Sequence, residues 1–194
     1  MAYPRVARLK TYQDFTEHLT ELGVELPCDE SAPPVGGSLS QSSEVDGMKI
    51  GNRFSILPME GWDGTDDGKP TDLTRRRWHN FGLSGAKLIW GGEAVAVRRD
   101  GRANPNQLMI NDGNLSELES LRTDLVEQHE KAFSKTDDLL VGLQLTHSGR
   151  FARPNDKAKI EPMTAQRNSA LDAKLGIADD SNICLLYTSD AADE

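Results

Sequence analysis

The stretch Leu139-Leu140-Val141-Gly142-Leu143-Gln144-Leu145-Thr146-His147-Ser148-Gly149-Arg150 is a short apolar run that ends in a polar, glycine-bearing turn. Two earlier runs have the same character: Phe54-Ser55-Ile56-Leu57-Pro58-Met59 and Ala86-Lys87-Leu88-Ile89-Trp90-Gly91-Gly92-Glu93-Ala94. Helix-like stretches separate the runs, so the expected order is strand, helix, strand, helix, strand. This alternation predicts an α/β fold with a parallel sheet, which places ligands at the carboxyl ends of its strands.

Length and composition narrow the class of protein. The 194 residues suffice for one domain with a substantial core. The formal net charge of -9 repels phosphate backbones, so we expect no nucleic-acid partner. No apolar run approaches the roughly 20 residues that span a bilayer, so we expect no membrane partner.

The N-terminus and the cysteines indicate a cytoplasmic setting. Residues 1–5 lack the apolar core of a secretory signal. Cys28 and Cys184 are the only cysteines, too few for a disulfide framework or a metal-ligand set. The four histidines show no metal-ligand spacing, so no metal site is expected.

Residues 1–49 precede the predicted sheet as a helix and a linker. Apolar residues recur at spacings of four and three from Thr11 to Leu22, which indicates an amphipathic helix that ends at Gly23. Proline, glycine and serine are frequent in residues 27–47, which predicts an irregular segment.

Two longer helices are expected between the strands. Thr71 is placed to cap the first, which carries Trp78 and Phe81. In the second, Ser116 and Glu119 have capping-box spacing. The apolar face of this second helix comprises Leu118, Leu121, Leu125, His129 and Ala132.

The last part of the chain changes character. A weak helix is expected from Ala170 to Leu175. Residues 184–194 continue no upstream pattern, and they resemble the translated adapter read-through found at the ends of metagenomic gene fragments. We therefore expect the natural sequence to run to residue 183, with an ordinary polar tail as the alternative.

Several residues at the predicted strand ends are candidates for binding. Gln144 lies in an apolar run, so we expect its amide to be buried and to need partners. An amide that donates and accepts suits a flavin or a pyrimidine, although neighbouring backbone could satisfy it equally well. His147 could face a substrate or pack under the loop. For Arg150 a structural salt bridge is the preferred interpretation.

The ends of the first two runs offer further candidates. Pro58 fixes φ and stiffens the backbone that follows, or simply ends a strand. Trp62 could stack on a ring or cover the mouth of a barrel. The pair Gly91-Gly92 permits close approach to the backbone or marks a β-bulge. Glu93 is either a polar site residue or a solvated carboxylate, and the run from Arg98 to Arg102 could attract a phosphorylated substrate or form a solvated turn.

Together these segments resemble the N-terminal part of the Old Yellow Enzyme family, the NADH:flavin oxidoreductases that bind FMN in a (β/α)8 barrel. The matching pieces are Gly51-Asn52-Arg53-Phe54 through Pro58-Met59, Leu88-Ile89 through Val97 with Gly101-Arg102, and Gln144 through Arg150. The resemblance covers residues 50–183. It implies roughly the first three of eight β/α units of a TIM barrel, and therefore a fragment that is inactive alone.

The resemblance also implies roles for particular residues. Pro58, Met59 and Gln144 would contact the isoalloxazine, with either Gly92 or Ala94 as the small residue against it. Substrate contacts would fall to Glu60, Trp62 and His147. Glu60 and Trp62 fall where relatives often carry a cysteine, threonine or histidine and an aromatic, a departure from the family pattern.

The implied activity is hydride transfer from NADH or NADPH through FMN to an activated alkene. The catalytic residues of the family lie on later strands and cannot be located here. Two alternatives stay open: a phosphate-binding barrel enzyme without flavin, such as an aldolase or isomerase, and a non-catalytic β/α scaffold. The sequence does not fix the oligomeric state.

Overall fold

The computed structural model describes residues 4–31 and 36–177. The chain divides into two compact units, Met1–Ser38 and Leu39–Glu194. This division lies earlier than the boundary at residue 49 that composition suggests. Residues 184–194 lie outside the described part, so the non-native tail stays a prediction.

The first unit contains a short 3₁₀ turn, Val6–Arg8, and helix α1, Tyr12–Leu22. Thr11 caps α1, because its hydroxyl accepts a hydrogen bond from the backbone N–H of Asp14 at 3.0 Å. Gly23 ends the helix with a φ of 63°, a conformation that glycine adopts without strain. The predicted helix and its end are confirmed.

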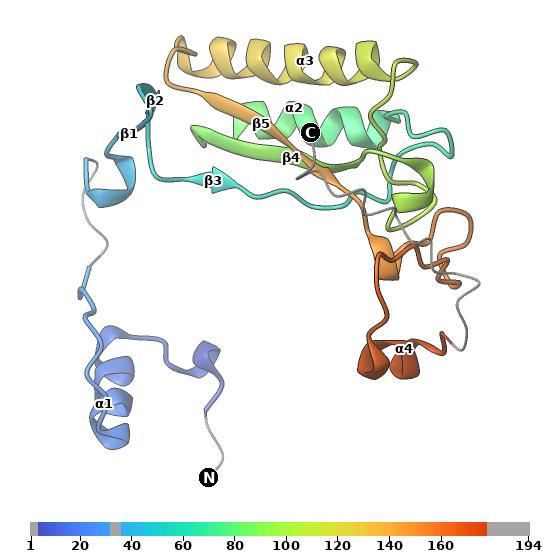
Figure 1. Ribbon diagram of the computed structural model, residues 1–194. Helices are drawn as coiled ribbons and strands as arrows, with labels where there is room; N and C mark the ends of the chain where they lie inside the picture. The colour runs from blue at the N-terminus through green and yellow to red at the C-terminus, as the bar shows by residue number, and fades with distance from the viewer. Residues whose placement is uncertain (1–3, 32–35, 178–194) are drawn as a thin grey trace. The chain divides into compact units, whose positions relative to one another are not determined.

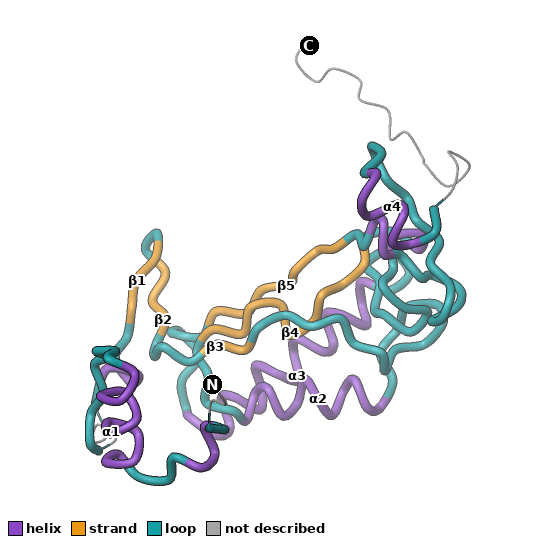
Figure 2. The backbone as a smooth tube through the Cα atoms, turned by 90° about the horizontal axis from the view of Figure 1, so that it is seen from below, coloured by secondary structure: helices purple, strands orange, loops and turns teal. Residues whose placement is uncertain are grey.

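The second unit is built on a parallel sheet with the strand order β3-β4-β5. Its strands are β3 (Ser55–Ile56), β4 (Leu88–Ala96) and β5 (Leu140–Thr146). Helix α2 (Asp72–Leu83) connects β3 to β4, and α3 (Leu115–Phe133) connects β4 to β5. Figures 1 and 2 show both helices on the same face of the sheet. The predicted alternation is confirmed; the described residues form no closed barrel, so the (β/α)8 architecture stays a prediction.

The core lies between that face and the two helices. It consists of Trp78, Ile89, Val95, Leu108, Leu118, Leu121 and Leu125. Gly82 lets α2 approach α3, since a Cβ there would collide with the carbonyl of Leu125. The predicted apolar face of α3 is therefore correct, except that Ala132 is exposed.

The start of α3 differs from the prediction. Asn114 occupies the N-cap position, so the capping box expected at Ser116 is wrong by two residues. Thr71, by contrast, does cap α2, and its backbone N–H donates to the hydroxyl of Thr74 at 3.2 Å. A final short helix, α4 (Ser169–Leu175), matches the weak helix expected there.

The segment predicted to be irregular contains a β-hairpin. Strands β1 (Ser43–Val45) and β2 (Met48–Ile50) pair antiparallel around Asp46 and Gly47. Both turn residues have positive φ, 50° and 77°, as a tight hairpin turn requires. The prediction for residues 27–47 is thus wrong from Ser43 onward, because the turn decides the local structure.

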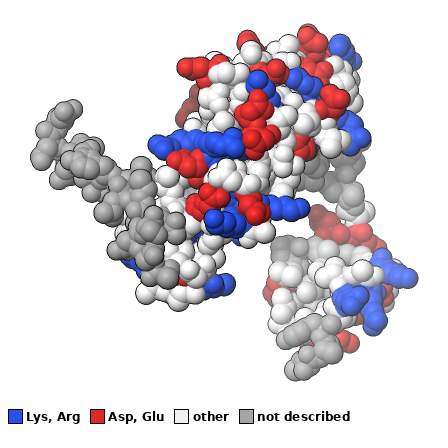
Figure 3. Space-filling view, turned by 90° about the vertical axis from the view of Figure 1, so that its right-hand side faces the viewer, with Lys and Arg blue, Asp and Glu red and all other residues white. Residues whose placement is uncertain are grey.

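Acidic and basic side chains are interspersed over the face seen in Figure 3. None of the described helices is both long and apolar enough to cross a membrane. Within the described residues, no group of three or more histidine, cysteine, aspartate or glutamate side chains could hold a metal ion.

Candidate functional site

The three apolar runs meet at Ala94. The backbone N–H of Ala94 donates to the carbonyl of Met59 at 3.0 Å, just beyond the end of β3. On its other side, Ala94 pairs with Gln144 in the register between β4 and β5. Met59, Ala94 and Gln144, which are distant in sequence, are therefore neighbours at one position across the sheet.

Gln144 belongs to the face of the sheet that the helices do not cover. Val141 and Leu143 pack against the core on the helix side. Alternation along a strand then turns Gln144 to the opposite face. Its side chain is exposed, so the expectation of a buried amide is wrong.

A β-bulge separates the two small candidates at the end of β4. The register with β5 shifts between Trp90 and Ala94, which confirms the bulge interpretation of the double glycine. A Cβ on Gly92 would lie 3.2 Å from Phe81 and 3.5 Å from Trp78, on the helix side. Gly92 is thus not on the face of Gln144, contrary to the role the resemblance gave it. Ala94 shares that face by register and is 4% exposed.

The residues after β3 are accessible. Pro58 is half-buried, whereas the side chains of Met59 and Trp62 are 72% and 56% exposed. Glu60 is exposed as well. All four lie next to the point where Met59 joins β4, so these residues are available to a ligand at the carboxyl end of the strands.

A buried carboxylate holds this loop to β4. Glu93 is fully buried, and its Oε1 accepts a hydrogen bond from the backbone N–H of Gly61 at 2.5 Å. Its Oε2 lies 2.6 Å from the guanidinium of Arg77 on α2, which also binds Asp63 at 2.8 Å. Burial raises the pKa of Glu93, and the charge of Arg77 opposes this rise. Glu93 is therefore a structural clamp on the loop rather than a solvated carboxylate.

A second buried group fixes the neighbouring loop, and sequence reasoning missed its role. Arg102 is fully buried and donates to the main-chain carbonyls of Asp66 at 2.6 Å, Thr65 at 3.1 Å and Gln107 at 2.7 Å. Gln107 in turn donates from its amide to the carbonyl of Ala94 at 2.8 Å. The solvated-turn interpretation therefore fails at Arg102, whose carbonyl partners leave no signature in the sequence.

His147 and Arg150 are occupied by structural contacts. Nδ1 of His147 accepts from the N–H of Gly149 at 3.0 Å, and its ring packs over Gly101. Arg150 forms an ion pair with Asp172 on α4 and donates to the carbonyl of Gln166 at 2.7 Å. The salt-bridge interpretation of Arg150 is confirmed; His147 packs under the loop, and its contact with a substrate stays a prediction.

A different buried cluster lies at the amino ends of the strands. Nζ of Lys87 is 2.7 Å from Asp138 and 2.9 Å from Nε2 of His129, whose Nδ1 faces the carbonyl of Gly82 at 2.9 Å. Burial and the charge of Lys87 lower the pKa of His129. Because Lys87 precedes β4, it is not the strand-end lysine that an aldolase would need.

No protein-family model matches this chain, and no curated protein matches it. Several solved structures are similar in part, two of them as follows. A complex of 2-naphthoyl-CoA reductase with 2-naphthoyl-CoA aligns with a TM-score of 0.49 and 14% identity, over 66% of this chain and 18% of that one. Old Yellow Enzyme from Pichia sp. AKU4542 aligns with a TM-score of 0.45 and 20% identity, over 62% of this chain and 29% of that one. The chain spans less than a third of either structure, and these values establish neither family nor function.

Proposed function

We propose that this chain belongs to an FMN-dependent oxidoreductase of the ene-reductase type, which passes hydride from NADH or NADPH to an activated alkene. The supporting observation is the meeting of Met59, Ala94 and Gln144. The Old Yellow Enzyme resemblance assigns flavin contacts to these three positions, and the fold brings them together through one main-chain hydrogen bond and one register pair.

The side chains at this place suit a planar, partly polar ring. Gln144 offers an exposed amide that both donates and accepts. Met59 is 72% exposed and Trp90, which pairs with Gly142 on the same open face, is 48% exposed. An isoalloxazine has apolar faces and an edge of N–H and C=O groups, so it would cover the apolar surface while its edge bonded the amide.

In this proposal, bound FMN would accept hydride from the nicotinamide and donate it to the alkene. The part of this chain is to hold the ring. Gln144 would donate to and accept from its polar edge, and the small side chain of Ala94 would leave room for its face. Glu93 and Arg77 keep the loop from Met59 to Trp62 against β4. Glu60 and Trp62, which belong to this loop, would contact the substrate.

The three strands of the parallel sheet carry none of the residues that the resemblance assigns to the flavin phosphate or to the substrate carbonyl. We therefore expect these 194 residues to bind FMN weakly and to oxidise no NADH. Copurification of the chain with stoichiometric yellow cofactor would contradict this weak binding while leaving the flavin assignment intact.

Titration with millimolar FMN, followed by the backbone amide NMR signals of the ¹⁵N-labelled chain, tests the proposal. We expect saturable shifts at Ala94 and Gln144, and binding at least about tenfold weaker in Gln144→Leu, as loss of two good hydrogen bonds implies. Gln13→Leu, an exposed glutamine on α1, is the matched control and should bind FMN as the unaltered chain does. Equal affinity in all three proteins, or no shifts near Ala94, would refute the flavin site.

A further inference from the structure

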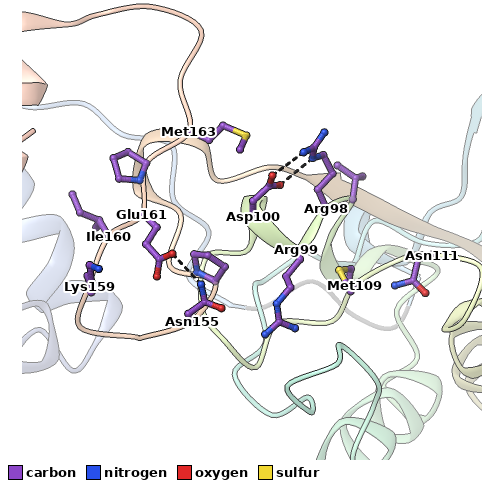
Figure 4. A pocket seen from close by; sticks show the side chains of 13 residues that line it. Arg98, Arg99, Asp100, Met109, Asn111, Asn155, Lys159, Ile160, Glu161 and Met163 are labelled. Atoms are coloured by element: carbon purple, nitrogen blue, oxygen red, sulfur yellow. Dashed lines mark hydrogen bonds and ion pairs between the residues drawn. The ribbon is translucent and has the colours of Figure 1, made fainter. Parts of the chain in front are cut away.

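A cavity of about 940 Å³ lies beyond the carboxyl end of β4, away from the proposed flavin residues. Figure 4 shows side chains entering it from two sides: residues 97–100 with Met109 and Asn111 on one, and the loop 154–163 on the other. None of Met59, Ala94 and Gln144 lines it. Its volume is within the range of small-molecule pockets.

Main-chain hydrogen bonds fix the loop that forms one wall. The N–H of Glu161 donates to the carbonyl of Ala152 at 2.8 Å, and the N–H of Met163 donates to that of Gly149 at 3.0 Å. The same segment is tied to the opposite wall, because the N–H of Arg153 donates to the carbonyl of Arg102 at 2.7 Å. The cavity is thus largely pre-formed, which lowers the entropy that a ligand must offset.

The lining combines apolar surface with positive charge. Val97, Met109, Ile160 and Met163 are among its apolar members. Of the two acids that line it, Asp100 is neutralised by two hydrogen bonds from Arg98, whereas Glu161 accepts one hydrogen bond from the neutral amide of Asn155 at 2.9 Å. The bond from Arg98 lowers the pKa of Asp100.

Two basic side chains of the lining, Lys159 and Arg99, are weakly paired or unpaired within the part of the chain that the structure describes. Among the described residues, no hydrogen bond or ion pair of the Lys159 ammonium is found. Arg99 binds only the exposed Asp66, at 3.2 Å, a surface pair of small free energy. Three basic side chains (Arg98, Arg99 and Lys159) and two acidic ones (Asp100 and Glu161) line the cavity, so its lining has a net charge of +1 and favours anions in a chain of net charge -9.

We propose that this cavity binds a small anionic amphiphile, an apolar molecule that carries one carboxylate or phosphate. The apolar part lies against Val97, Ile160 and Met163, and the anionic head faces Lys159 and Arg99. This site is separate from the flavin position, so it stands or falls independently of the proposed function.

Titration with octanoate, followed by the amide signals of Val97, Met109 and Met163, tests the site. Octanol, which lacks the charge, and inorganic phosphate, which lacks the tail, are the two reference probes. We expect saturable shifts with octanoate and clearly weaker binding of both references. Octanol binding as tightly as octanoate, or phosphate doing so, would overturn the proposal, as would the absence of saturable shifts at these three residues.

Two lysines in the wall loop give a matched pair of variants. Lys157 and Lys159 are both exposed and two residues apart, but only Lys159 lines the cavity. Lys159→Ala should weaken octanoate binding about 1.5-fold to fivefold, the range of an exposed ion pair, and Lys157→Ala should leave it unchanged. Equal effects of the two substitutions would show a diffuse charge effect and refute the assignment of the head group to Lys159.

Discussion

The two faces of the central sheet differ in what covers them. On one face α2 and α3 bury Ile89 and Val95 completely. On the other face, Trp90 is 48% exposed and Gln144 is exposed. The covered face therefore supplies the free energy of folding, whereas residues on the open face are free to be selected for contacts with a ligand.

Two tryptophans measure this difference most directly. Trp78 on α2 is 1% exposed within the core, and Trp90 on β4 lies on the open face. We expect Trp78→Ala to lower the free energy of unfolding by about 3–5 kcal/mol, because it removes a large buried ring and leaves a cavity. Trp90→Ala should cost below about 1 kcal/mol. Urea denaturation of both variants is the measurement, and equal losses would abolish the distinction between the faces.

Glu93 lies in the bulge of β4, where the register with β5 shifts. A substitution of Glu93 tests whether its contacts hold the loop after β3 against β4. Glu93→Gln keeps an acceptor for the N–H of Gly61 but removes the ion pair with Arg77. We expect a loss of about 1–3 kcal/mol in the free energy of unfolding, as for a buried hydrogen bond to a charged group.

Glu60→Gln is the control for this loss. Glu60 is exposed and belongs to the same loop, so its substitution should stay within about 0.5 kcal/mol. A Glu93→Gln variant as stable as Glu60→Gln would mean that the clamp does not hold the loop.

The sequence predicts correctly the elements whose apolar residues recur with a regular period. Leu118, Leu121 and Leu125 recur at helical spacing and do form the buried face of α3. Composition does not predict the hairpin at Ser43–Ile50, although Asp46-Gly47 between Val45 and Met48 is a strong turn signal. The surrounding prolines and serines favour an irregular segment instead.

The sequence predicts which residues of the candidate site come together, but not the direction in which each of them points. Strand order brought Met59, Ala94 and Gln144 to one place, as alternation predicts. The direction of Gly92 depends on the bulge, which shifts the register in a way that residue types alone do not determine. Arg102 and Glu93 depend on partners in other loops, most of them main-chain groups, and such contacts leave no spacing in the sequence.

The pH dependence of stability tests the covered face through His129. Its imidazole is fully buried between the carbonyl of Gly82 and the ammonium of Lys87, with Asp138 beyond, and its pKa is lowered chiefly by burial. The unfolded chain therefore binds a proton near pH 6.5 that the folded chain does not take up until a lower pH. Stability is full above that value and falls as pH drops below it, by at most about 1.4 kcal/mol per pH unit.

Urea denaturation of the chain and of His129→Gln at several pH values between 7.5 and about 5 isolates this contribution, since His129 titrates near pH 6.5 when unfolded. The variant is expected to be less stable at neutral pH and to show a shallower fall on acidification. Parallel curves for the two proteins would show that His129 is not the residue whose burial makes the fold sensitive to acid.

The smallest effect on stability is expected for a substitution of Gln144. Its neighbour Leu143, on the opposite face of the sheet, is the comparison. Leu143 packs on the covered face, so Leu143→Ala should cost about 2 kcal/mol, the lower end of the range for buried leucines. Gln144→Leu should change the free energy of unfolding by less than about 0.5 kcal/mol, because its amide faces solvent. A change above about 1 kcal/mol would mean that another element covers this face. A stable Gln144→Leu chain also ensures that any loss of FMN binding reports a missing contact with the amide and not a loss of fold.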